Sequence, residues 1–209
     1  MHLLRKQIAF IPQSPFLIQG TIRENLDPFN ELSDEEIAAV IQEVNLKEKI
    51  ESFEHGINTY CSEANNLFSA GQKQLICLAR AIVRKAKILV LDEATANVDL
   101  ETDNFIQRKL KERFSTCTVL IVAHRLATII DSDRILVMSD GEAREFNHPY
   151  SLMVRSTTDE SITANRGYFS QMVLETGAET ALSLFEIAKD SYKKSNEKWP
   201  TTPATADDD

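Results

Sequence analysis

The sequence predicts an α/β fold built around a parallel sheet. Two continuous apolar runs, 87–91 and 118–123, are typical of buried strands in such sheets. Asp99 is expected to cap a helix between them, and the order strand, helix, strand requires a parallel crossover. A shorter run, 8–11, predicts a further buried strand that ends at Pro12, because proline cannot donate to a strand ladder.

Two capping boxes mark helix starts, at 33–36 (SDEE) and at 69–72 (SAGQ). The first precedes apolar residues at helical spacing, namely Ile37, Val40, Ile41 and Val44. The second opens a longer helix whose apolar side carries Leu75, Leu78, Ala79, Ile82 and Val83. Residues 139–141 (SDG) predict a hairpin turn between strands at 134–138 and 142–146.

The last quarter of the chain has a different character. Residues 155–166 are polar and are expected to form a linker. A terminal helix is predicted from the helical spacing of its apolar residues, Ala181, Leu184, Phe185 and Ala188. Residues 201–209 are expected to be disordered.

The composition excludes several classes of function. A net charge of −9 and a pI near 5.0 disfavour nucleic acid as a partner. Three widely spaced cysteines argue against a disulfide framework or a zinc site and indicate a reducing cytosol. No apolar run reaches the roughly 18 to 20 residues of a membrane span, so any membrane-embedded partner is expected outside these residues.

Polar residues follow all three predicted parallel strands. Gln13 follows the first, Asp92 and Glu93 end the second, and His124 follows the third. Ligands of open parallel sheets bind beyond the carboxyl ends of the strands. Asp92 is expected to hold Mg²⁺, Glu93 to orient and deprotonate a water, and His124 to bond a terminal phosphate. The alternatives are an Asp-Glu pair without function and a histidine that only caps the strand end.

The start at Ser69 also allows two interpretations. It is either an ordinary helix start or an anion site made of helix N–H groups and a serine hydroxyl. The phosphate chemistry expected at the strand ends favours the anion site. Gly71, in the first turn, would let the backbone approach an anion closely.

Four segments, in order, resemble the Q-loop, signature motif, Walker B strand and H-loop of an ATP-binding cassette domain. They are 11–15 (IPQSP), 68–72 (FSAGQ), 88–95 (ILVLDEAT) and 122–125 (VAHR). The resemblance extends over about residues 3–150. Residues 20–29 (GTIRENLDPF) are further similar to the second nucleotide-binding domain of subfamily C, the multidrug-resistance-protein-like transporters.

The resemblance implies a partial RecA-like P-loop NTPase core at 1–154, with an α-helical subdomain at 14–85. Residues 155–209 would form a C-terminal helical extension. The implied cofactors are ATP and Mg²⁺. The implied partners are a second nucleotide-binding domain and the transmembrane domains of an exporter, at the cytoplasmic face of a membrane.

The resemblance also assigns roles to single residues. Gln13 would contact Mg²⁺ and couple the site to the transmembrane helices. The signature residues Ser69, Ala70, Gly71 and Gln72 would grip the terminal phosphate bound to the opposing domain. Asp99 would belong to the D-loop between the two sites.

Three departures from the family pattern stand out. Phe68 and Ala70 replace the usual leucine and glycine of the signature, and Asn97 alters the D-loop. The six glycines form no G-x-x-x-x-G-K-[ST] loop, so we expect the chain to be part of a longer protein and inactive alone.

The sequence also allows two other functions. A soluble cassette ATPase of repair or translation is disfavoured by residues 25–29 (NLDPF) and by the transporter-like Q-loop. A non-catalytic regulatory module is favoured by the missing phosphate loop and disfavoured by Glu93 and His124.

Overall fold

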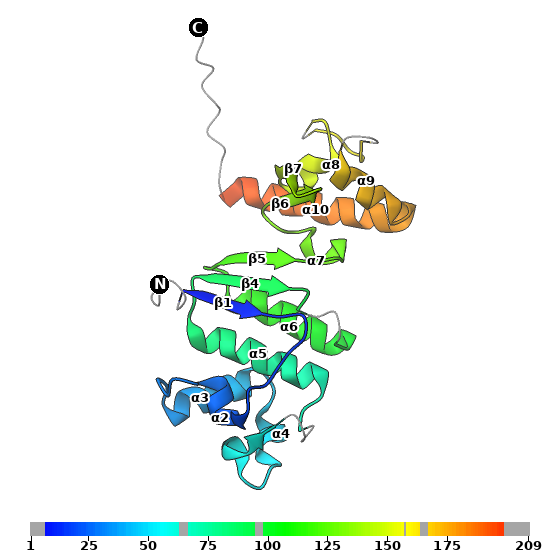
Figure 1. Cartoon of the computed structure of the whole chain (residues 1–209). Helices are drawn as coiled ribbons and strands as arrows, with labels where there is room; N and C mark the ends of the chain where they lie inside the picture. The colour runs from blue at the N-terminus through cyan, green and yellow to red at the C-terminus, as the bar shows by residue number, and fades with distance from the viewer. Residues whose placement is uncertain (1–6, 63–66, 95–97, 157, 164–166, 199–209) are drawn as a thin grey trace. The chain divides into compact units, whose positions relative to one another are not determined.

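The computed structural model describes residues 7–62, 67–94, 98–156, 158–163 and 167–198 (Figure 1). The chain divides into two compact units, Met1–Val122 and Ala123–Asp209. Each unit has its own cluster of buried apolar side chains.

The first unit contains a parallel sheet of three strands in the order β1-β4-β5. They are β1 (Ile8–Ile11), β4 (Ile88–Asp92) and β5 (Thr118–Val122). Helix α6 (Leu100–Arg113) connects β4 to β5, and Asp99 caps its start. The predicted α/β class and parallel sheet are therefore confirmed.

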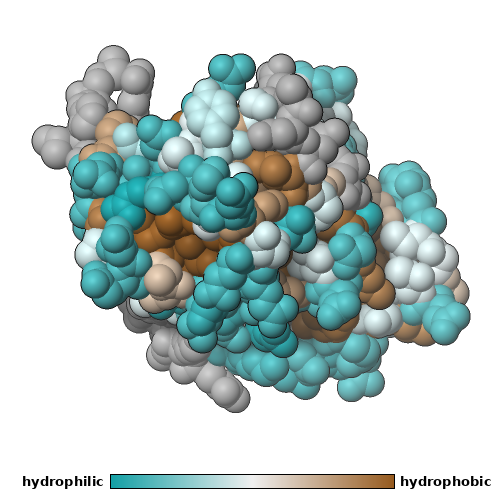
Figure 2. All heavy atoms as spheres, turned by 90° about the horizontal axis from the view of Figure 1, so that it is seen from below, coloured by the Kyte–Doolittle hydropathy of each residue, from teal (hydrophilic) through white to brown (hydrophobic). Residues whose placement is uncertain are grey.

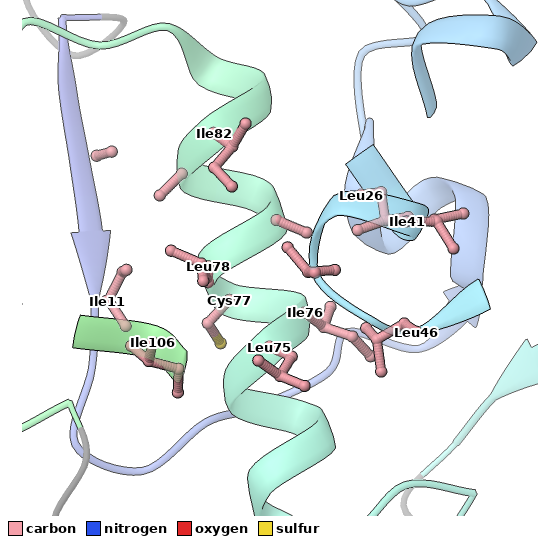
Figure 3. Close-up of a cluster of buried hydrophobic side chains, with 14 of the residues drawn as sticks. Ile11, Leu26, Ile41, Leu46, Leu75, Ile76, Cys77, Leu78, Ile82 and Ile106 are labelled. Carbon is pink, nitrogen blue, oxygen red and sulfur yellow. The ribbon is translucent and has the colours of Figure 1, made fainter. Parts of the chain in front are cut away.

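Helices α5 (Ala70–Arg84) and α6 lie on one face of this sheet (Figure 1). Their apolar side chains meet those of the strands in one buried cluster, and Figure 3 shows part of it. The labelled members from the sheet and these helices are Ile11, Leu75, Ile76, Cys77, Leu78, Ile82 and Ile106. This cluster fixes the sheet against α5.

The prediction that the strands are buried on both faces is wrong for the face of the sheet opposite α5 and α6. Phe10 is 55% exposed, and Leu120 and Val122 of β5 are 54% and 55% exposed. Register places Phe10 beside Val90 and Val90 beside Leu120, so they share a face. Continuous apolar sequence cannot tell a strand covered on two faces from one covered on one. The described helices of this unit that cover the sheet, α5 and α6, both lie on the other face.

The rest of the first unit is largely helical. Its elements are β2 (Gly20–Thr21), α2 (Ile22–Leu26), α3 (Asp34–Glu43), α4 (Lys47–Glu51), η1 (Gly56–Asn58) and β3 (Tyr60–Cys61). Ser33 and Glu36 form the predicted capping box of α3. Helices α2 and α3 contact α5 through buried side chains including Leu26 and Ile41 (Figure 3). The face in Figure 2 is mostly hydrophilic, with apolar residues between the polar ones.

The second unit combines a hairpin with helices. Its elements are α7 (Leu126–Ile129), β6 (Ile135–Ser139), β7 (Glu142–Asn147), α8 (Pro149–Met153), α9 (Tyr168–Glu175) and α10 (Ala178–Lys198). Asp140 and Gly141 have φ values of +54° and +78°, as the predicted tight turn requires. The predicted terminal helix is confirmed as α10, whose residues Ala181, Leu184, Phe185 and Ala188 are buried. No helix in the described ranges is long and apolar enough to cross a bilayer.

The segment predicted as a linker is hydrogen-bonded to α8 and to itself. Tyr150 Oη donates to the Asp159 carbonyl at 2.7 Å, and Asp159 Oδ2 accepts from the Arg155 amide at 3.0 Å. The Thr163 amide donates to the Met153 carbonyl at 2.8 Å. Residues 164–166 and 201–209 lie outside the described residues. The domain boundaries 1–154, 14–85 and 155–209 stay predictions.

Candidate active site

Gln13 and Glu93 are brought into contact at one edge of the sheet. Because β1 and β4 are adjacent and parallel, their carboxyl ends meet there. Gln13 Nε2 donates a hydrogen bond to Glu93 Oε2 at 2.8 Å, across 80 positions of sequence. Two of the predicted site residues therefore lie side by side.

Glu93 has an unusual backbone conformation. Its φ of +43° lies in the left-handed region, which costs a non-glycine residue about 1 to 3 kcal/mol. Its amide donates to the Val122 carbonyl at 2.9 Å, so the neighbouring strand holds the turn in place. Strained residues of this kind cluster at functional sites, and this one carries the proposed catalytic carboxylate.

Asp92 is the last residue of β4 and is partly buried opposite Val122. Among the described residues, no group of three or more His, Cys, Asp or Glu side chains could hold a metal ion. Mg²⁺ does not need such a group, since it keeps several waters and binds one or two carboxylates together with phosphate oxygens. The Asp92 carboxylate and Gln13 Oε1, at the ends of adjacent strands, fit that partial ligand set.

Helix α5 begins as the predicted capping box. Ser69 Oγ accepts from the Gln72 amide at 3.2 Å, and the Ser69 amide donates to Gln72 Oε1 at 3.0 Å. Ser69 and Ala70 are exposed. These bonds are those of an ordinary helix start, and binding of an anion there stays a prediction. The Ser69 hydroxyl accepts in this arrangement, so its proton can still be donated.

Gly71 and Asp99 lie next to each other, where the starts of α5 and α6 meet. A Cβ at Gly71 would lie 3.5 Å from Thr102 Oγ1 and 3.6 Å from Asp99 Oδ2. Asp99 accepts from the Thr102 amide at 2.9 Å and from its hydroxyl at 2.8 Å. These hydrogen bonds lower the pKa of Asp99, so the carboxylate is charged at neutral pH. Asn97, the D-loop departure, lies outside the described residues.

His124 is exposed and lies between β5 and α7. It belongs to the second compact unit, whereas Glu93 belongs to the first. Its approach to Glu93 or to a phosphate therefore stays a prediction.

Several known proteins resemble this chain over most of its length. A family model described as ABC transporter matches residues 1–96. The human ATP-binding cassette sub-family C member 4 is 50% identical over 196 residues, which is 94% of this chain and 14% of that protein. The chain belongs to the ATP-binding cassette family. Its similarity to sub-family C members further identifies it as part of a nucleotide-binding domain of that subfamily.

Two other relatives support the subfamily. The Drosophila melanogaster "probable multidrug resistance-associated protein lethal(2)03659" is 47% identical over 93% of this chain and 14% of that protein. The Rattus norvegicus sub-family C member 2 is 45% identical over 86% of this chain and 11% of that protein. The chain thus spans about one-seventh or less of the length of these relatives.

Two residues that contact the site region were not predicted from the sequence. Gln74, which is 0% exposed, donates through Nε2 to the Pro12 carbonyl at 3.2 Å. Arg80 Nη1 donates to the Phe16 carbonyl at 2.9 Å, and its Nε donates to the Asn25 carbonyl at 2.7 Å. Gln74 and Arg80 thus both contact the loop that contains Gln13. The sequence feature that could have indicated these two residues is their polar character within the otherwise apolar segment 74–83 (QLICLARAIV).

Proposed function

We propose that this chain is part of the ATP-hydrolysing motor of a membrane exporter, acting at the cytoplasmic face of the membrane. The observation that carries the proposal is the hydrogen bond from Gln13 to Glu93, next to Asp92 at the carboxyl ends of β4 and β1. The transporter family model supports this role over a soluble ATPase of repair or translation.

The residues at this edge divide the chemistry between them. Asp92 and Gln13 Oε1 would hold Mg²⁺, which when bound neutralises phosphate charge. The Glu93 carboxylate accepts a proton from the attacking water, as a general base. The Gln13 amide holds that carboxylate in place by donating a hydrogen bond to Oε2 at 2.8 Å.

The remaining site residues act on the terminal phosphate. His124 donates a ring N–H to it. The start of α5, from Ser69 to Gln72, supplies backbone N–H groups and a hydroxyl to the nucleotide held by the second nucleotide-binding domain. Asp99 lies beside Gly71, which supports its assignment to the boundary between the two sites. In the complete transporter, Gln13 couples this site to the transmembrane domains.

Asp92→Asn should raise the Mg²⁺ concentration needed for half-maximal ATP turnover by about tenfold or more, because it removes one charge-assisted ligand. The measurement is phosphate release by the complete polypeptide that carries this chain, over a range of Mg²⁺ concentrations. The control is Asp190→Asn, an exposed position on α10. An unchanged Mg²⁺ requirement in the Asp92 variant would contradict the metal assignment.

Gly71→Asp should weaken binding of the nucleotide on the opposite domain by about tenfold or more, because the added carboxylate repels phosphate. The added Cβ would lie 3.6 Å from Asp99 Oδ2, so the new carboxylate would also stand close to an existing negative charge. Gly71→Ala separates the added charge from the loss of the glycine, since its Cβ would meet only ordinary contacts at 3.5 to 3.6 Å.

Photocrosslinking of ATP to each domain separately measures this effect. The expected result is a loss on the opposite domain that is larger for the aspartate variant than for the alanine variant. A loss confined to the nucleotide on the same domain would exclude a shared site.

A further inference from the structure

Helix α5 holds the segment after β1 through a buried glutamine. Gln74 is 0% exposed, and its Nε2 donates to the Pro12 carbonyl at 3.2 Å. A carbonyl oxygen can only accept a hydrogen bond, so the NH2 end of the Gln74 side-chain amide must face Pro12. Gln74 Oε1 is buried without a hydrogen-bond partner among the described residues. Burying an oxygen without a hydrogen-bond partner costs free energy, and an apolar side chain would avoid this cost. The contribution of Gln74 to the site is therefore its hydrogen bond to Pro12.

The bond acts directly on the position of Gln13. The β1–β4 ladder ends at the pair Ile11 and Leu91, so the Pro12 carbonyl lies beyond it. Its oxygen, the Gln13 nitrogen and the Gln13 Cα share one rigid peptide plane. Fixing the Pro12 oxygen therefore fixes the point from which the Gln13 side chain reaches Glu93, 2.8 Å away.

A second contact from the same helix holds the far end of the segment. Arg80 donates to the Phe16 carbonyl at 2.9 Å and to the Asn25 carbonyl at 2.7 Å. Asn25, which is 1% exposed, accepts from the Ile18 amide at 2.9 Å. Residues 12–16 are thus attached to α5 at both ends, and Ile18 is attached to Asn25 of α2.

We propose that Gln74 is a positioning residue that holds the Gln13 amide against the Glu93 carboxylate. A displacement of α5 then moves Gln13 and changes the orientation of the catalytic base. The inference rests on the proposed function only where it names Glu93 as that base. The positioning itself can be measured without turnover.

The first test is amide hydrogen exchange in the complete polypeptide that carries this chain. Gln74→Met keeps the length of the side chain and removes the donor. We expect exchange of the peptide spanning residues 13–18 to accelerate about tenfold or more, with α3 unchanged. Leu78→Met is the control, because Leu78 is 0% exposed on the same helix and belongs to the buried apolar cluster.

Gln74→Glu separates the hydrogen bond from the packing. A carboxyl buried at this position stays protonated, so its O–H can donate to the Pro12 carbonyl. We expect the exchange rate of residues 13–18 in this variant to stay within a few-fold of the parent. Equal behaviour of the Met and Glu variants, or an equal acceleration in Leu78→Met, would overturn the inference.

The second test is a double-mutant cycle in ATP turnover. Gln74→Met alone should lower kcat about tenfold with little change in KM for ATP. In a Gln13→Ala background the same substitution should cost nothing further, because the group that it positions is already gone. Additive losses would mean a general structural role and would overturn the inference. If the parent polypeptide hydrolyses no ATP, the proposed function fails, while the exchange measurement still decides the role of Gln74.

Discussion

Glu93→Gln lowers ATP turnover by about 100-fold or more and leaves ATP binding intact, if Glu93 is the general base. Loss of a positioned base typically costs 10²- to 10⁴-fold in rate. The structure makes this substitution clean, because a glutamine oxygen can still accept the 2.8 Å hydrogen bond from Gln13 Nε2. The side chain can keep this contact while it loses its negative charge and its basicity.

Phosphate release and nucleotide binding are measured together in the complete polypeptide that carries this chain. Glu101→Gln, an exposed carboxylate in the first turn of α6, is the matched control. Turnover within a few-fold of the parent in the Glu93 variant would remove Glu93 from its role and require another base. Turnover lost together with binding would point to a structural defect.

The 209-residue chain alone should bind Mg-ATP about a thousandfold more weakly than a domain with a phosphate loop. Its six glycines form no G-x-x-x-x-G-K-[ST] motif. Such a loop supplies several backbone N–H bonds and a lysine ammonium, each charge-assisted bond contributing roughly 1.5 to 3 kcal/mol. Losing three of them costs about three powers of ten in affinity. Asp92 and Glu93 are acidic and cannot replace these donors.

Calorimetric titration of the purified chain with Mg-ATP measures the affinity, and a phosphate-release assay measures turnover. We expect millimolar or weaker binding and no steady hydrolysis. Micromolar binding, or hydrolysis abolished by Glu93→Gln, would contradict this prediction. Either result would mean that another segment of the chain binds the phosphates.

The features that the sequence predicted well depend on local chemistry or on simple topology. The capping boxes at Ser33 and Ser69 need only four consecutive residues, and both form as expected. The meeting of Gln13 and Glu93 follows from polar residues at the ends of two parallel strands. The hairpin turn at Asp140 and Gly141 is likewise encoded locally.

Other features could not be predicted because tertiary contacts determine them. Whether Leu120 is covered depends on which elements lie on that face, and the apolar run itself is the same in both cases. Gln74 looks like any helical glutamine until its contact with Pro12 is seen. The left-handed φ of Glu93 is held by the bond to Val122 on the neighbouring strand, and no local pattern indicates it.

The pairing of β1 with β4 has a consequence for synthesis on the ribosome. Ile8 pairs with Ile88, so the first strand emerges with its partner still 80 positions away. At about 5 to 20 residues per second, that strand waits roughly 4 to 16 s for β4. During this time the apolar residues Ile8, Phe10 and Ile11 lack the partner that β4 later provides. Nascent chains stalled before residue 88 should therefore bind holdase chaperones, and release should follow once β4 has left the exit tunnel.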